Sequence, residues 1–302
     1  MDYDTLIDAE TWAFINRTAE FYPPDATDMS IADQRRVYDQ MCEAFRQPRP
    51  DGVSCRDRDC SGVPCRLYEV GETDTTVVFF HGGGFVVGSL DSHDDVCAEI
   101  CACTGIRVLA VDYRLSPEHK HPAAFDDAIA ATTYAAQTWP GTLLLCGDSA
   151  GGNLAAATAH ALRGKLAFAG QVLIYPGLGG DHDAGSYLSH ANAPMLTRDE
   201  IIYYMAIRES DLQDPTAAPL RDTDFVGLPR TVAIAAECDP LADDAQAYAD
   251  RIKAAGGKAH CIEEPGLTHG YLRGRTSVTR ARDSFDRIIA ALTALGRGDW
   301  PF

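Results

Sequence analysis

A serine between an apolar stretch and an alanine-rich stretch is the first residue whose setting suggests chemistry. The segment GDSAG at 147–151 places Ser149 in a Gly-x-Ser-x-Gly pattern, after the apolar run TLLLC and before the helix-like run NLAAATAHAL. Small neighbours permit a sharp strand-to-helix turn that presents a serine hydroxyl for attack on a carbonyl carbon. A serine here can also cap a helix N-terminus. The preceding apolar strand favours the nucleophile.

A serine hydroxyl needs a base, and the base needs an orienting acid. In sheets that carry such a turn, the acid and then the base follow the serine along the chain. Asp239 ends the apolar stretch TVAIAAECD, and His269 lies in the loop GLTHGY after the next strand-like stretch. Both positions belong to the carboxyl ends of strands, where the serine is expected. We therefore predict a catalytic triad of Ser149, Asp239 and His269.

The other acidic residues and histidines near these positions have structural explanations. Asp243 and Asp244 would lie in the first turn of a helix, where carboxylates favour the helix dipole. Asp239 itself could serve as an N-cap. His160, within the helix after the turn, and His260, within a strand, are typical of packing or surface residues.

Three consecutive glycines, Gly82 to Gly84, stand between the apolar runs VVFFH and FVVG. A tetrahedral intermediate carries negative charge on the former carbonyl oxygen, and backbone N–H groups are suitable fixed donors for that charge. A loop can bring them within ~3 Å of the oxygen only where side chains are missing. We predict an oxyanion hole formed by Gly83, Gly84 and Ala150.

The pattern of the chain indicates which elements position these groups. From about residue 62, short apolar strands alternate with helices, which predicts an α/β fold with an open, mostly parallel sheet covered on both faces. Residues 1–50 show helical periodicity, and residues 179–228 interrupt the alternation with an irregular and helical insertion. We expect these two segments to form a cap over a catalytic domain made of residues 51–178 and 229–302.

The insertion also supplies candidates for the wall of a substrate pocket. The segment SHANAPMLTRDEIIYYM contains Met195, Tyr203 and Tyr204. Large apolar and aromatic side chains of this kind line small-molecule sites, and they pack equally well inside a cap helix. Both interpretations of these three residues stay open at this point.

Composition excludes several classes of protein. With 44 acidic against 26 basic residues the net charge is −18, which argues against nucleic acids and anionic membranes as partners. The apolar stretches are strand-length, so no membrane span is expected, and the acidic start MDYDTLIDAETWAF does not resemble a secretory signal. We expect a cytoplasmic protein. The ten cysteines lack paired metal-ligand spacing, so we expect reduced thiols and no metal site.

Five ordered segments give the chain a family resemblance. The set HGGGFVVGSLDSHD, VDYRLSPEHKHPAAFDD, GDSAGGNLAA, DPLADDA and THGY resembles the hormone-sensitive-lipase family of bacterial carboxylesterases, which has the α/β-hydrolase fold. The resemblance implies the triad and oxyanion hole given above, a cap, no cofactor, and a small-molecule ester with a short acyl chain as substrate. It also suggests a homodimer through the edge of the last strand, near residues 258–263.

The resemblance predicts a serine carboxylesterase that works through an acyl-enzyme. Two other classes of function share the scaffold. An amidase, an arylformamidase or a lyase would use the same oxyanion hole with a different pocket. A non-catalytic small-molecule receptor would use the fold without a working triad, and fold alone does not decide function.

Overall fold

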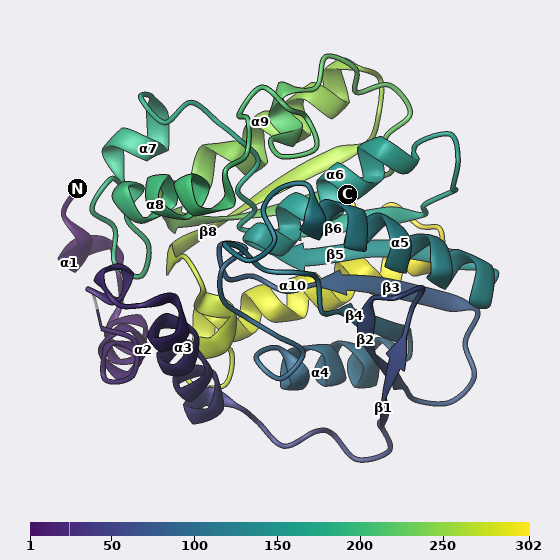
Figure 1. Cartoon of the computed structure of the whole chain (residues 1–302), viewed down its shortest axis with the longest axis horizontal. Helices are drawn as coiled ribbons and strands as arrows, with labels where there is room; N and C mark the ends of the chain where they lie inside the picture. Colours follow the sequence, from purple (N-terminus) through teal and green to yellow (C-terminus); the bar gives the residue numbers. More distant parts are fainter. Residues whose placement is uncertain (24) are drawn as a thin grey trace.

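A mixed sheet forms the centre of the computed structural model, which describes residues 1–23 and 25–302 (Figure 1). Within these residues the sheet has eight strands in the order β1-β2-β4-β3-β5-β6-β7-β8. All neighbours from β4 to β8 pair in parallel, whereas β1–β2 and β2–β4 are antiparallel. The strands are β1 (Ser54–Asp59), β2 (Pro64–Glu69), β3 (Thr75–Phe80), β4 (Arg107–Val111), β5 (Thr142–Asp148), β6 (Gly170–Ile174), β7 (Thr231–Cys238) and β8 (Ala259–Thr268).

Helices cover both faces of the sheet (Figure 1). The α-helices are α1 (Tyr3–Leu6), α2 (Ala9–Ala19), α3 (Ile31–Phe45), α4 (Asp94–Thr104), α5 (Ala123–Thr138), α6 (Ala150–Leu162), α7 (Gly185–Ser189), α8 (Arg198–Arg208), α9 (Ala242–Ala254) and α10 (Thr279–Gly296). The 3-10 helices are η1 (Ala26–Asp28), η2 (Pro219–Arg221) and η3 (Tyr271–Gly274). Helices α4 and α10 pack on one face, and α5, α6 and α9 pack on the other. The predicted α/β class is confirmed.

The core consists of two apolar layers separated by the sheet. All six residues of β3 are buried, and their side chains alternate between the layers. Val77 and Phe79 belong to the cluster with α4 and α10, whereas Val78 and Phe80 belong to the cluster with α5 and α6. A strand covered on both faces has to be apolar throughout, which explains why its sequence shows no alternation.

The N-terminal helices and the insertion lie at the same end of the sheet. Figure 1 shows α2 and α3, in purple, facing α7 and α8, in green, on the left of the molecule. Side chains of α2, α3 and α8 line one cavity together with Ser149, which follows β5, and His269, which follows β8. Two segments distant in sequence therefore enclose the carboxyl ends of the parallel strands.

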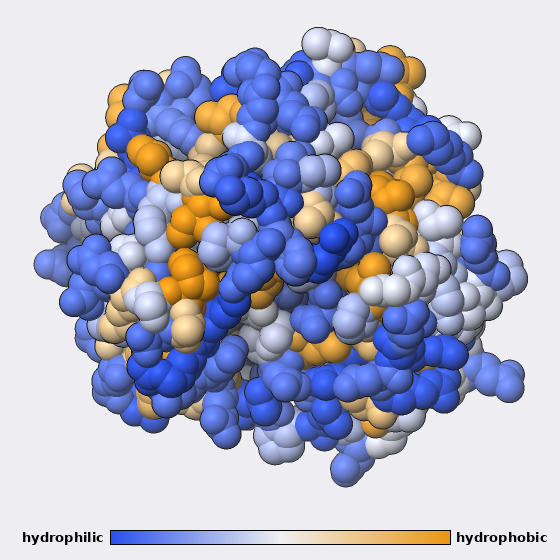
Figure 2. Space-filling model, viewed as in Figure 1, coloured by the Kyte–Doolittle hydropathy of each residue, from blue (hydrophilic) through white to orange (hydrophobic). Residues whose placement is uncertain are grey.

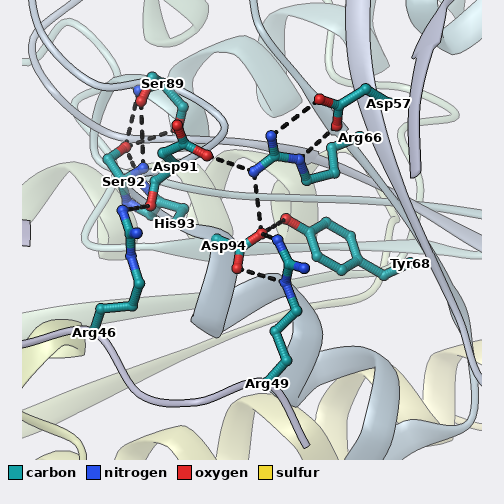
Figure 3. A network of polar contacts seen from close by, with 10 residues as sticks. All are labelled: Arg46, Arg49, Asp57, Arg66, Tyr68, Ser89, Asp91, Ser92, His93 and Asp94. Atoms are coloured by element: carbon teal, nitrogen blue, oxygen red, sulfur yellow. Dashed lines mark hydrogen bonds and ion pairs between the residues drawn. The ribbon is translucent and has the colours of Figure 1, made fainter. Parts of the chain in front are cut away.

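A network of ion pairs connects the segment after α3, which contains Arg49, to strand β2 and helix α4 (Figure 3). The Arg49 guanidinium donates to both carboxylate oxygens of Asp94, at 2.7 and 2.8 Å. Asp94 begins α4 and also accepts from Arg66 at 3.1 Å and from the Tyr68 hydroxyl at 2.8 Å. These contacts fix where the N-terminal helices join the rest of the fold.

Strand β1 is a feature that the sequence pattern did not predict. Its residues SCRDRD are mostly charged and exposed, so they lack the apolar signal of the other strands. It forms the sheet edge beside β2, where its arginines and aspartates face solvent. The face in Figure 2 is likewise mostly hydrophilic, with small separate groups of apolar residues.

The described helices include none that is long and apolar enough to cross a membrane. The ten cysteines are all free thiols, and most of them are buried. Burial of a free cysteine is ordinary because the side chain behaves as a small apolar group.

Candidate active site

Ser149 occupies a strained turn between β5 and α6. Its backbone has φ 54° and ψ −118°, a conformation that costs a non-glycine residue about 1–3 kcal/mol. The flanking glycines are required by close approach, because a Cβ on Gly151 would lie 1.9 Å from the Phe80 carbonyl oxygen. A Cβ on Gly147 would lie 2.4 Å from the Gly151 carbonyl. The turn therefore holds the serine above the end of the sheet.

The three residues predicted as a triad lie within hydrogen-bond distance of one another. The Ser149 Oγ is 2.8 Å from His269 Nε2, and His269 Nδ1 is 2.6 Å from Asp239 Oδ2. With the Nδ1 proton directed at the carboxylate, Nε2 is free to accept the serine proton. These distances match those required of a nucleophile, its base and an orienting acid.

Ser149 and Asp239 could each have served as a helix cap, and the structure answers this differently for the two residues. Among the described residues, the Ser149 side chain makes no hydrogen bond to the start of α6, so the hydroxyl is available to His269. Asp239 is fully buried, and its Oδ1 accepts from the Leu241 N–H at 2.9 Å. One oxygen of Asp239 thus fixes the turn while the other holds the imidazole.

The glycine loop lies beside the serine in the conformation that only glycine adopts easily. Gly83 has φ +127° and Gly84 has φ +59°, and both line the same cavity as Ser149 and Ala150. A Cβ on Gly83 would lie 2.2 Å from the Val87 carbonyl oxygen. The loop therefore presents bare backbone to the space in front of the serine, as expected of donors to an oxyanion.

Asp148, which precedes the serine, holds this glycine loop in place by a hydrogen bond to its backbone. Its Oδ1 accepts from the Gly82 N–H at 2.8 Å, and its Oδ2 lies 3.3 Å from both His93 Nε2 and the Tyr175 hydroxyl. Burial alone would raise the pKa of Asp148, but His93 and Arg273 outweigh burial and lower that pKa to about 2. A buried anion thus links the serine turn to the glycine loop. Sequence reasoning missed this role, although the position next to Ser149 was a usable signal.

A cavity of about 430 Å³ opens in front of Ser149. Met195 and Tyr204 line it, as the pocket-wall interpretation requires. Tyr203 does not belong to the wall formed by the described residues, so the packing interpretation fits it better than the pocket-wall interpretation. Its hydroxyl accepts from Gln34 Nε2, so it packs α8 against α3. Neighbours in a helix point about 100° apart, which explains why only one of the two tyrosines faces the cavity.

Further wall residues come from elements that motifs did not single out. The Tyr22 hydroxyl is 2.9 Å from the Tyr204 hydroxyl, and Tyr38 and Met41 enter the cavity from α3. Arg208, at the end of α8, is a lining cation. It follows Tyr204 by four residues, and this i,i+4 spacing could have revealed it. Within the described part of the chain, no group of three or more metal-ligating side chains is arranged to hold an ion.

Known proteins share both the sequence and the fold. A family model described as the alpha/beta hydrolase fold matches residues 77–273. The chain is 36% identical over 247 residues to carboxylesterase NlhH of Mycobacterium tuberculosis, covering 76% of this chain and 77% of that protein. It is 31% identical over 269 residues to the ethyl acetate hydrolase of Pseudomonas putida, covering 82% and 85%. The solved structure of a hyperthermophilic esterase from the archaeon Pyrobaculum calidifontis matches with a TM-score of 0.87 and 29% identity, covering 96% and 99%.

Proposed function

The chain belongs to the α/β-hydrolase fold family as a carboxylesterase similar to hormone-sensitive lipase, and from this premise we propose that it hydrolyses short-chain esters through Ser149, His269 and Asp239. The observation that carries the proposal is the unbroken chain of contacts from the serine Oγ through the imidazole to the buried carboxylate, at 2.8 and 2.6 Å.

The reaction follows from which atoms face one another. Ser149 Oγ attacks the ester carbonyl carbon while His269 Nε2 takes the hydroxyl proton. The oxyanion is stabilised by backbone N–H groups of Gly83, Gly84 and Ala150. The intermediate collapses, the C–O bond breaks, and the alcohol leaves with the proton from His269. Water then attacks the acyl-enzyme by the same route, which releases the acid and restores the serine.

The size of the cavity supports a preference for short chains. Its volume of about 430 Å³ lies near the lower end of the ~300–1,000 Å³ found for small-molecule sites. Residues 1–50 and 179–228 form the cap in our proposal, with Tyr204 and Met195 as part of its inner wall. Residues 51–178 and 229–302 form the catalytic domain beneath it.

We also retain a homodimer as part of the proposal. Strand β8 is last in the strand order and pairs with β7 on one side. Its other edge, near residues 258–263, offers backbone groups to the same strand of a second copy.

Hydrolysis of 4-nitrophenyl esters from acetate to palmitate tests the function. The proposal predicts the highest kcat/KM at the shortest chains and loss of that activity in Ser149→Ala. A preference for palmitate would contradict the short-chain assignment. If anilides or formamides were cleaved and esters were not, the amidase class would replace the esterase. Binding without turnover of any substrate would favour a receptor.

A further inference from the structure

The catalytic cavity contains a buried cation that the triad chemistry does not use. Arg208 lines the cavity and is 5% exposed. Burial lowers the pKa of Arg208 to about 9, so the guanidinium is still charged at neutral pH. Its Cζ lies 3.6 Å from the ring centroid of Phe85, the residue after the oxyanion glycines. The charge therefore sits beside the loop that faces the reacting carbonyl.

This guanidinium is only partly satisfied by the protein. Of its five N–H groups, the Nη1 and Nη2 groups make one contact each, to the Ala217 carbonyl and to His121 Nδ1, both at 3.2 Å. Three N–H groups remain without an acceptor in the described chain. The acidic side chain in this cluster, Asp214, is 3.1 Å from His121 Nε2, on the other side of the imidazole. A buried cation without a direct carboxylate partner is costly, which suggests that a ligand supplies one.

A second polar side chain at the same end of the cavity is also incompletely paired. Asn153 Nδ2 donates to the Gly177 carbonyl at 2.8 Å and to the Ala217 carbonyl at 2.9 Å. Its buried Oδ1 has no hydrogen-bond partner among residues 1–23 and 25–302. The Ala217 oxygen is thus shared by Asn153 and Arg208. Arg208 lacks acceptors, whereas Asn153 Oδ1 lacks a donor, so a carboxylate could pair with Arg208 but not with this oxygen.

Two helices fix the distance from this region to the reacting carbonyl. On α8, Tyr204 covers Gly84, and Arg208 follows one turn later above Phe85. On α6, Asn153 follows Ser149 by one turn. Side chains one turn apart are separated by about 5–6 Å. At about 1.2 Å per bond in an extended chain, this corresponds to roughly four to five bonds between the carbonyl carbon and a group on Arg208.

We propose that Arg208 binds a carboxylate of the substrate, so that the preferred esters carry a carboxylate about four to five bonds from the scissile carbonyl carbon. The inference rests on the proposed esterase function and names its substrate class. Monoesters of glutaric and adipic acid place the carboxylate on the acyl side at this distance. 4-Acetoxybutanoate places it on the alcohol side.

The test compares each acid with its neutral carboxamide of nearly the same shape. Hydrolysis is followed in a pH-stat for monoethyl glutarate, monoethyl adipate and 4-acetoxybutanoate, each beside its amide. We expect the acid-to-amide ratio of kcat/KM in the wild type to exceed about tenfold for at least one pair, because charged hydrogen bonds are stronger than neutral ones. In Arg208→Met that ratio should fall about tenfold or more, and Arg208→Lys should keep part of it.

Arg163 provides a matched control for a purely structural role. It donates to the carbonyls of Asp224 and Val226, at 2.7 and 3.2 Å, and thus also ties the insertion to the core, but from outside the cavity. The acid-to-amide ratio should be unchanged in Arg163→Met. An equal loss of that ratio in both variants, or an unchanged ratio in Arg208→Met, would overturn the proposal and leave Arg208 as an anchor of α8.

The wild type alone keeps the proposal testable if Arg208→Met does not fold. Glutarate should inhibit hydrolysis of 4-nitrophenyl acetate at lower concentration than glutaramide does. Equal inhibition by the two compounds would refute the carboxylate site, and stronger inhibition by glutaramide would assign the region to a neutral ligand that donates to Asn153. Either result leaves the esterase intact, whereas failure to hydrolyse 4-nitrophenyl acetate at all would refute the proposed function itself.

Discussion

The contact between Gly84 and Tyr204 leads to a quantitative prediction about the oxyanion loop. In Gly84→Ala the added Cβ would lie 2.7, 2.8 and 2.9 Å from Cγ, Cδ1 and Cδ2 of the Tyr204 ring. An ordinary contact begins at 3.4 Å, so either the loop or the ring has to move by 3.4 − 2.7 = 0.7 Å. The Tyr204 hydroxyl bonds to that of Tyr22, which holds the ring in place. We therefore expect the loop to move away from the oxyanion.

A displacement of this size has a predictable kinetic cost. A misplacement of about 1 Å in an active site lowers the rate by roughly 100-fold, so Gly84→Ala should lower kcat for 4-nitrophenyl acetate by about 10- to 100-fold. The positive φ adds a strain of about 1–2 kcal/mol to the folded state. Steady-state kinetics measures the first effect, and urea unfolding measures the second.

Removing the ring should restore the loop. In a double-mutant cycle, Gly84→Ala should lower kcat much less when it is added to Tyr204→Ala than when it is added to the wild type. The double variant should thus recover most of the kcat that Gly84→Ala loses. Gly105→Ala is the control for backbone strain, because Gly105 has φ +71° and, apart from its own chain neighbours, no described residue has an atom within 4 Å of an added Cβ. It should lose stability and keep its kcat. Additive effects in the cycle, or a wild-type kcat in Gly84→Ala, would refute the reasoning.

Three further predictions concern buried carboxylates. Asp239→Asn should lower kcat by about 10⁴-fold, because the amide no longer holds His269 in the required tautomer; a loss below tenfold in steady-state kinetics would contradict this. In Asp148→Asn the amide oxygen can still accept from the Gly82 N–H, but the negative charge is lost. We therefore expect kcat to fall about tenfold with little change in KM. A change in KM alone would count against a role of Asp148 in positioning the loop. Burial raises the pKa of Asp244 to about 6, so the native state binds this proton more tightly than the unfolded state does. Wild-type stability should therefore fall by about 2 kcal/mol between pH 4 and pH 8 relative to Asp244→Asn, and equal pH slopes in urea unfolding would exclude that effect.

The geometry of parallel sheets explains why three residues chosen from the sequence lie within hydrogen-bond distance of one another. Ser149 and Asp239 follow the buried apolar strands β5 and β7, and His269 follows the more polar strand β8. The carboxyl ends of parallel strands meet at one edge. Strand ends are visible as transitions from apolar to polar or glycine-rich sequence. The order of residues along the chain and the place of His269 in a loop after a strand then selected the histidine.

Other features depend on side-chain direction and on partners distant in sequence. Strand β1 carries charges in place of an apolar pattern because it lies at the sheet edge. Tyr203 and Tyr204 are adjacent in sequence. The contact of Tyr203 with Gln34 on α3 is what directs Tyr203 away from the cavity. The roles of Asp148 and Arg208 depend on contacts with residues 66 positions and nine positions away, respectively. The position next to Ser149 and the i,i+4 spacing from Tyr204 mark these two residues, but neither signal identifies the partners they contact.

The central claim is that Ser149 forms the covalent intermediate, and trapping that intermediate tests the claim most directly. The wild type is treated with diethyl 4-nitrophenyl phosphate, which phosphorylates an activated serine, and the modified peptide is identified by mass spectrometry. We predict one adduct per chain, located on Ser149, with esterase activity lost in proportion to its formation, and no adduct in Ser149→Ala. Modification at another residue, or full activity in protein whose Ser149 is completely modified, would contradict the proposed mechanism.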